Sequence, residues 1–155
     1  MPRQIRRQDR ALNQEQAWRI LEKGEYGVLS TVSAEGQPYA TPLSYCLLDG
    51  DIYFHCALAG HKLDNLAQNN RACFCVVGQT QVLPEKFGTL YESAVVFGPA
   101  AEATGEEKQK ALESLLAKYS ADFRAEGLAY IEKLSGRARV FKISVEAISG
   151  KARTA

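Results

Sequence analysis

The densest group of polar residues lies between His55 and Asn65, where an apolar run ends. The hydrophobic period changes there from alternating to helical, which predicts a strand, a loop of small residues and a helix that begins at His61. The first backbone N–H groups of a helix have no partner within it and carry the positive end of its dipole. With the Lys62 ammonium and the His61 imidazole added, this helix start predicts an anion site, best matched by a phosphate. Asn65 lies one turn further along the same face, so we expect it to reach the same ligand.

Two other interpretations of these residues stay open. His61 and Lys62 could simply face water at a solvated helix start. A metal site could instead be assembled from the cysteines and histidines, which are Cys46, His55, Cys56, His61, Cys73 and Cys75. Against a metal, the chain has no Cys-x₂-Cys pair, and every cysteine has apolar neighbours, as core cysteines do. We therefore expect free thiols and no metal.

His55 is the one candidate for a catalytic role. It stands between Phe54 and Cys56 at a strand end, so its ring should point to the face opposite theirs. A buried structural histidine is one interpretation. The other puts the ring beside a cofactor or substrate, where an imidazole with a pKa near 6.5 donates or accepts a hydrogen bond at working pH.

The composition describes an ordinary single domain over residues 1–155. The chain is 46% hydrophobic and 24% charged, which excludes disordered and coiled-coil classes. It has 19 basic and 18 acidic residues, so bulk charge argues against nucleic acid or a membrane surface as partner. No stretch is apolar enough to span a membrane, and no apolar region follows the basic N-terminus. We expect a cytoplasmic location. The GxxxxGK[ST], GxGxxG, HExxH and GxSxG motifs are all absent.

Six strands and several helices are expected to position the candidate site. The strand predictions are 26–33, 39–48, 51–56, 72–77, 93–101 and 138–145; the helix predictions are 13–24, 61–67, 104–119 and 123–134. Short turns join the first three strands, so they should pair antiparallel. We expect 78–88 to be irregular and 93–101 to be buried on both faces. Asn13 with Gln16, and Thr104 with Glu107, predict capping boxes. Segregated helices favour an α+β fold, mainly β, with a small antiparallel barrel.

Short sequence blocks also stand in a specific order: 25–32, 37–39, 41–45, 52–57, 60–65, 74–78, 84–87, 91–93 and 148–152. Together they resemble the pyridoxamine 5′-phosphate oxidase-like split-barrel family, and within it the branch of flavin-binding and nitroimidazole-resistance proteins. The resemblance runs from about Arg7 to Lys151. It implies a six-stranded antiparallel split β-barrel with peripheral helices, forming a homodimer that binds FMN at the subunit interface.

The resemblance also implies roles for individual residues. His61 and Lys62 match the pair that holds the FMN phosphate, which is the anion site already expected from the helix start. The other implied cofactor neighbours are Thr41, Leu43 and Ser44 along the isoalloxazine and ribityl chain, His55 and Ala57 beside the flavin, and Tyr91, Glu92 and Ser93 near the dimer interface.

Two functions are compatible with this resemblance. The first is an FMN-dependent oxidoreductase that reduces a small acceptor of the nitroaromatic or quinone type. The alternative is a non-catalytic flavin-binding sensor or storage module, with haem or deazaflavin binding on the same fold as a further possibility. The C-terminal residues 149–155 depart from the arginine-containing signature of the true pyridoxamine phosphate oxidases, so vitamin B6 oxidation is not expected.

Overall fold

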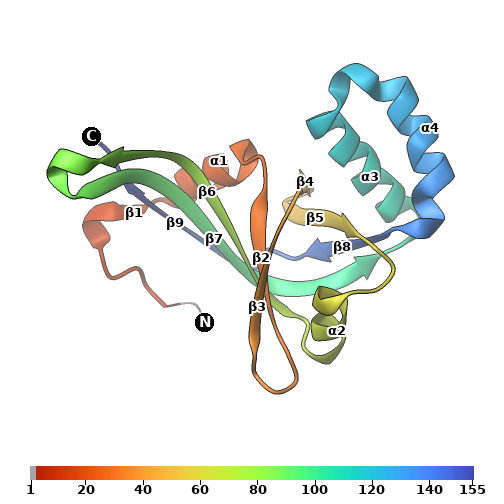
Figure 1. Cartoon of the computed structure of the whole chain (residues 1–155), viewed down its shortest axis with the longest axis horizontal. Coiled ribbons are helices and arrows are strands. Elements are labelled where there is room, and N and C mark those ends of the chain that lie inside the picture. Colours follow the sequence, from red (N-terminus) through yellow and green to blue (C-terminus); the bar gives the residue numbers. More distant parts are fainter. Residues whose placement is uncertain (1–2) are drawn as a thin grey trace.

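The computed structural model describes residues 3–155 and consists mainly of antiparallel strands with four α-helices at the periphery (Figure 1). The helices are α1 (Gln14–Lys23), α2 (His61–Gln68), α3 (Gly105–Tyr119) and α4 (Arg124–Leu134). The strands are β1 (Ala11–Leu12), β2 (Gly27–Val32), β3 (Pro38–Leu43), β4 (Cys46–Leu48), β5 (Asp51–Cys56), β6 (Arg71–Leu83), β7 (Gly88–Ala103), β8 (Arg139–Ile143) and β9 (Ala147–Arg153). The predicted α+β class, mainly β, is confirmed. Among the described residues, no helix is long and apolar enough to cross a bilayer.

The strand order is β3-β2-β6-β7-β8-β5-β4, with β9 pairing both β7 and β1. β3 and β4 therefore lie at opposite ends of this path, although only Ser44 and Tyr45 separate them along the chain. The sheet curls as a split barrel does but stays open rather than closed. The single strand predicted over 39–48 is thus two strands, because β3 leaves β2 after Leu43 and Cys46 pairs with Tyr53 of β5.

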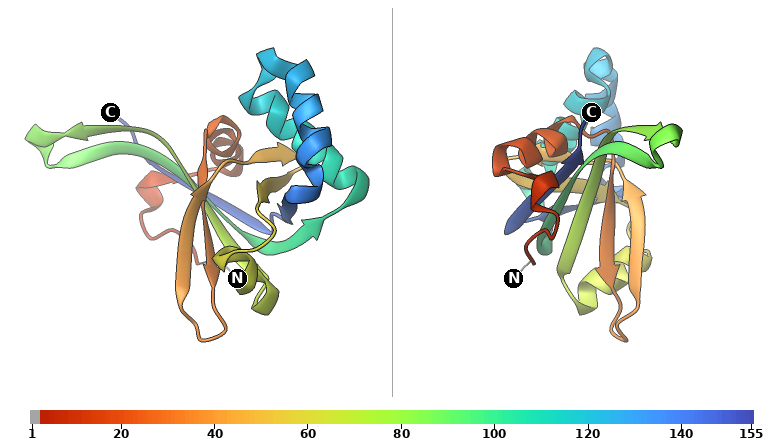
Figure 2. Two further views of the ribbon diagram at one scale, coloured as in Figure 1. Left: turned by 45° about the vertical axis from the view of Figure 1, so that its right-hand side comes forward. Right: turned by 90° about the vertical axis from the view of Figure 1, so that its left-hand side faces the viewer.

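The predicted irregular segment 78–88 is instead the end of a long hairpin. β6 and β7 stay paired as far as Leu83 and Gly88, with a bulge between Val77 and Thr80. A 3-10 turn that begins at Pro84 closes the hairpin, so the proline ends a strand rather than breaking one. We call residues 79–91 the arm. Figures 1 and 2 show that it projects away from the rest of the fold.

The strand expected over 93–101 is buried on one face only, contrary to the prediction. Ala94, Val96 and Ala100 are buried, while Val95 and Phe97 between them are half-exposed. β9 was not predicted as a strand. Its apolar alternation is interrupted at Gly150, where a Cβ would lie 2.8 Å from the Cβ of Ala17 in α1. Glycine there allows α1 to lie directly on β9.

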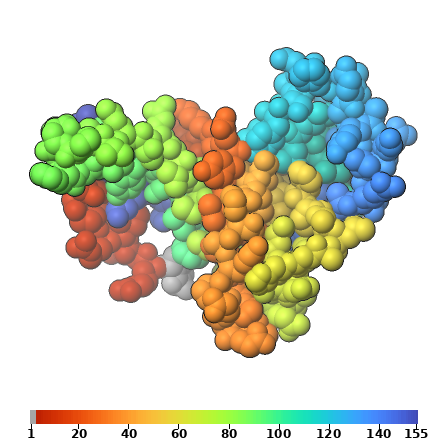
Figure 3. Space-filling model, in the orientation of Figure 1, coloured from red at the N-terminus to blue at the C-terminus, as the bar shows by residue number. Residues whose placement is uncertain are grey.

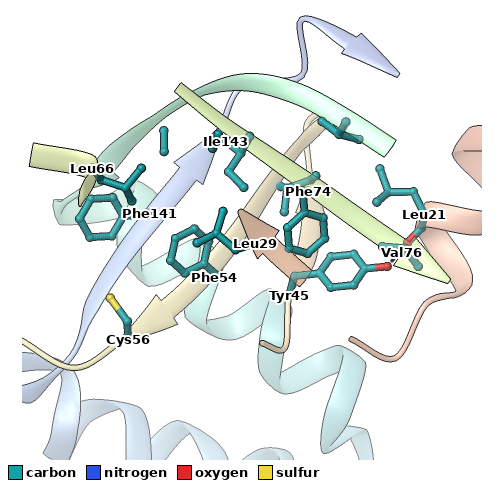
Figure 4. Packing of buried hydrophobic residues seen from close by; sticks show 14 of the residues in the cluster. Leu21, Leu29, Tyr45, Phe54, Cys56, Leu66, Phe74, Val76, Phe141 and Ile143 are labelled. Atoms are coloured by element: carbon teal, nitrogen blue, oxygen red, sulfur yellow. Dashed lines mark hydrogen bonds between the residues drawn. The ribbon is translucent and has the colours of Figure 1, made fainter. Parts of the chain in front are cut away.

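The core fills the inside of the curled sheet (Figure 4). Tyr45 is fully buried and its ring meets Phe74 edge-on at 4.9 Å between centroids. Its hydroxyl donates to the carbonyl oxygen of Leu21 at the end of α1. The two-residue link between β3 and β4 is therefore anchored through the core.

The two predicted capping boxes have different outcomes. Asn13 and Gln16 exchange both hydrogen bonds, at 2.8 and 2.9 Å, as expected. The side chain of Thr104 makes no capping bond. Glu107 instead accepts a hydrogen bond from the Tyr53 hydroxyl at 2.8 Å, which ties α3 to β5.

Candidate functional site

The start of α2 has the donors that an anion requires. The N–H groups of Leu63 and Asp64 donate to the carbonyl oxygen of Gly60 at 3.1 Å, so those of His61 and Lys62 have no acceptor within the helix. Gly60 supplies no capping side chain, and a Cβ built on it would meet nothing within 4 Å. Among the described residues Lys62 makes no ion pair. These donors and the open space above them fit a phosphate group.

The ring of His61 is held against β3. It stacks on Tyr39 with ring centroids 3.9 Å apart and an angle of 21° between the planes. Figures 1 and 2 show α2 beside the β2–β3 hairpin, which is the arrangement that brings the two rings together. Tyr39 covers one face of the His61 ring. The alternative in which His61 simply faces water at the helix start is therefore only partly correct.

Residues of β3 line the approach to this helix start. Tyr39, Thr41 and Leu43 alternate with exposed residues, so they share the face that meets His61. Ser44 follows at the strand end and is exposed. β3 has β2 as its only neighbour in the described sheet, so its other edge presents backbone N–H and C=O groups without strand partners. A planar heterocycle with amide-like edges could bond to such an edge.

His55 lies on the outer face of β5, opposite buried Phe54 and Cys56, as predicted. It is not a buried core histidine. Partial desolvation, followed by repulsion from the nearby Lys62 ammonium, lowers the pKa of the imidazole below its usual 6.5. The lowered pKa favours the neutral ring at pH 7, which has one donor and one acceptor nitrogen.

Ala57 and Asn65 have different environments. Ala57 is exposed in the loop between β5 and α2, close in sequence to the helix start. Asn65 is 4% exposed, and its amide nitrogen donates to the hydroxyl of Thr31 at 3.0 Å. The structure therefore turns Asn65 toward β2, where it fixes α2 on the sheet, and does not bring it to the surface that His61 and Lys62 share.

Tyr91, Glu92 and Ser93 do not join this group in one chain. They lie in the part of β7 that pairs with β9, opposite Arg153, Ala152 and Lys151. Desolvation opposes ionisation of Tyr91, but hydrogen bonds and attraction from Arg10 and Lys151 outweigh it and lower its pKa. Glu92 accepts a hydrogen bond from the backbone N–H of Gln79 at 3.3 Å.

The cysteines are free thiols. Cys46 and Cys56 are buried, Cys73 and Cys75 are half-buried, and burial raises the pKa of each. Within residues 3–155, no three His, Cys, Asp or Glu side chains are grouped so that they could hold a metal ion.

Sequence reasoning missed a cavity of about 610 Å³ between the central strands and helices α3 and α4. Ser44 and His55 form its floor, and Tyr119, Phe123 and Tyr130 are among its walls. These three aromatic side chains are 41%, 63% and 66% exposed; Tyr119 ends α3, Phe123 belongs to the 3-10 turn Ala121–Phe123, and Tyr130 lies in α4.

The comparisons with known proteins agree with this fold. Residues 13–152 match the model of a protein family described as pyridoxamine 5′-phosphate oxidase. No curated protein matches the chain.

Solved structures share the fold at low sequence identity. A proposed 5-nitroimidazole antibiotic resistance protein from Bacteroides thetaiotaomicron is 20% identical, with a TM-score of 0.74 over 92% of this chain and 86% of that one. A FAD-binding protein from Mesorhizobium loti is 24% identical, with a TM-score of 0.66 over 94% and 98%. A FAD- and haem-binding protein from Mycobacterium smegmatis is 19% identical, with a TM-score of 0.80 over 92% and 72%.

Proposed function

The chain belongs to the pyridoxamine 5′-phosphate oxidase family, and on this premise we propose that it is a flavoprotein that binds FMN and reduces a small acceptor. The observation that carries the proposal is the start of α2. There an open space is bordered by free backbone donors, the Lys62 ammonium and an imidazole fixed against Tyr39.

A terminal phosphate suits this position for electrostatic reasons. Its charge would interact with the positive end of the α2 dipole and with Lys62, and it would accept hydrogen bonds from His61 and Lys62 N–H groups. A charge-assisted hydrogen bond of this kind stabilises binding by about 1.5–3 kcal/mol. The same donors suit a phosphate monoester such as FMN because Gly60 leaves the approach open.

The ring system would then lie along β3 toward β5. Thr41 and Leu43 offer a half-buried surface, and the free edge of β3 offers backbone donors and acceptors. His55 is neutral and close enough to Lys62 to feel its charge, so it would stand beside the ring rather than beside the phosphate. FMN supplies electron transfer itself, so the protein needs to provide position, hydrogen bonds and access.

We also propose that the active form is a homodimer whose second copy supplies Tyr91, Glu92 and Ser93. In one chain these residues are not grouped with α2, and several apolar side chains near them lack cover. Val82 and Phe87 of the arm are 67% and 96% exposed. Large apolar side chains this exposed on a projecting hairpin are consistent with an interface that covers them. A symmetric pair would bury both arms and create two equivalent sites.

The absorption spectrum of the purified protein tests the cofactor. Bands of oxidised flavin are expected, with FMN identified by mass after release; a Soret band would instead indicate haem. Acceptor-dependent oxidation of NAD(P)H then separates an oxidoreductase from a flavin-binding sensor or store. Bound flavin without any turnover of nitroaromatic or quinone acceptors would overturn the enzymatic part of the proposal.

A further inference from the structure

The cavity under the α3–α4 hairpin is contiguous with the proposed flavin site. Ser44 and His55 belong both to its floor and to the residues expected beside the flavin ring. The α3–α4 hairpin is also hydrogen-bonded to Tyr45, in the two-residue link between β3 and β4. The Lys118 ammonium donates to the carbonyl oxygen of Tyr45 at 2.8 Å, and the Tyr119 hydroxyl accepts from the Tyr45 N–H at 3.1 Å. A molecule in this cavity would therefore lie against the part of the fold that borders the ring.

The way in which α3 and α4 pack on each other leaves this space beside the central strands. α3 and α4 approach closely at Gly127, where a Cβ would lie 2.1 Å from a methyl carbon of Leu116. α3 packs on β4, β5 and β8, α4 packs on α3, and a cavity of about 610 Å³ lies between the two helices and the Ser44 and His55 side chains. Cavities of this size accommodate small organic ligands. Figure 3 shows the hairpin and the arm as separate projections on either side of the central strands, so the arm of the same chain does not cover the hairpin.

The lining of the cavity selects by charge. Its walls are mainly leucine and aromatic side chains, and the one formally charged side chain among the described lining residues is Glu126. Desolvation and the nearby Lys62 ammonium lower the pKa of His55, which favours its uncharged form. The nearby ammonium groups of Lys108 and Lys118 are already hydrogen-bonded to backbone carbonyls, Lys108 to Ser135 and Ala138 and Lys118 to Tyr45. Lys62 lies near His55 and would face the FMN phosphate in the flavin-loaded protein. An anion in this cavity would therefore meet the exposed Glu126 carboxylate, of like charge, and no cation among the lining residues.

We propose that this cavity is the acceptor site, and that it takes flat aromatic molecules that are neutral or cationic and rejects those that carry a carboxylate, sulfonate or phosphate. Tyr130 and Phe123 would stack on the acceptor, Glu126 would favour a positive charge, and His55 would offer a hydrogen bond from the floor. That the bound molecule is an electron acceptor rests on the proposed function. The preference of the cavity for neutral or cationic ligands can be measured without turnover.

A matched set of ligands tests the preference directly. 4-Nitrobenzyl alcohol, 4-nitrobenzylamine and 4-nitrobenzoate have similar size and differ in charge. Titration calorimetry on the flavin-loaded protein is expected to give binding of the alcohol and the amine, with the benzoate about tenfold weaker or worse. Repeating the titrations after removal of the cofactor separates the cavity from the flavin site.

Two variants with matched controls assign the binding to this cavity. Glu126→Lys should reverse the preference toward 4-nitrobenzoate, whereas Glu132→Lys on the same helix, outside the lining, should not. Tyr130→Ala should lower the affinity for 4-nitrobenzyl alcohol about threefold to tenfold. Tyr26 is similarly exposed but lies outside the cavity, so Tyr26→Ala should leave this affinity unchanged.

The outcomes separate the two proposals. Equal affinity for all three ligands, or an unchanged preference in Glu126→Lys, overturns the cavity assignment even if the protein is yellow. Absence of all binding overturns it too, and is the result expected if a second copy of the chain fills the cavity. Charge-selective binding in a protein that holds no flavin would instead sustain the ligand preference and refute the flavoprotein proposal.

Discussion

The rings of Tyr39 and His61 lie 3.9 Å apart between centroids, with 21° between their planes. This stacking joins the edge strand β3 to the first residue of α2, two elements separated in the chain by β4 and β5. The proposed ring and phosphate positions are thereby fixed relative to one another. Asn65 fixes the other side of the same helix through Thr31 of β2.

Replacing Lys62 tests the phosphate position. Lys62→Ala removes the one ammonium at the start of α2, and we expect FMN affinity to fall by about 1.5–3 kcal/mol, measured by quenching of flavin fluorescence in a titration of the cofactor-free protein. Lys62→Arg should retain most of the affinity because the charge remains. Lys133→Ala, a loss of charge on exposed α4, serves as control. Unchanged affinity in Lys62→Ala would place the phosphate elsewhere.

The stacked pair predicts a difference between two replacements of Tyr39. Tyr39→Phe keeps the ring and should bind FMN as the parent does. Tyr39→Leu loses the aromatic contact, which is about 0.5–1.5 kcal/mol between paired rings. We expect a lower melting temperature and weaker FMN binding, because the His61 imidazole is then free to rotate. Equal behaviour of the two variants would show that stacking does not position His61.

The sequence predicted the elements of the site more reliably than the contacts between them. The period change at His61 located the start of α2 correctly, because helix-start chemistry is local. The inward turn of Asn65 could not be predicted in this way, since its partner Thr31 lies on a different element. The arm could not be predicted from its sequence, because a segment that contains Pro84 shows no strand pattern of its own, and only the pairing of Leu83 with Gly88 places the proline in a turn.

The cavity shows a further limit of sequence reasoning. Phe123 and Tyr130 lie in the helix predicted over 123–134, and the apolar residues of such a helix usually face a core. Whether they do depends on how far α4 lies from the sheet, and this distance is set by the contact of Gly127 with Leu116 and by the bond from Lys118 to Tyr45. Both are tertiary features with no local sequence signature.

The arm predicts an effect on assembly. Phe87 is 96% exposed and has φ of 51°, a left-handed conformation that asparagine tolerates better than phenylalanine. In a monomer Phe87→Asn should therefore be neutral or slightly stabilising. If the arm contacts a second copy, the same change should weaken the dimer, seen as a shift of mass toward about 17 kDa in light scattering on dilution. Parent protein that is already 17 kDa at micromolar concentration would refute the dimer.

The lowered pKa of His55 predicts an effect of pH on stability. Desolvation and the Lys62 charge hold its folded pKa below the 6.5 of an unfolded histidine, so the unfolded chain binds more protons as pH falls through 6.5. The contribution of neutral His55 to the free energy of unfolding is therefore fully present above pH 6.5. It is lost as the pH falls from 6.5 toward the pKa of His55 in the folded protein. His55→Gln should flatten the melting temperature between pH 7.5 and about 5.5.

Replacing His55 by alanine also distinguishes a structural from a functional role for this residue. If His55 acts beside the flavin, His55→Ala should fold almost normally but change the rate of flavin reduction, or its dependence on pH between about 5.5 and 7.5. If it only supports the fold, the melting temperature should fall while activity per bound flavin stays constant. Its exposed position on β5, opposite Phe54 and Cys56, favours the first result, because little packing is lost with the ring. Unaltered kinetics per flavin would exclude a role in electron transfer and leave His55 as part of the cavity floor.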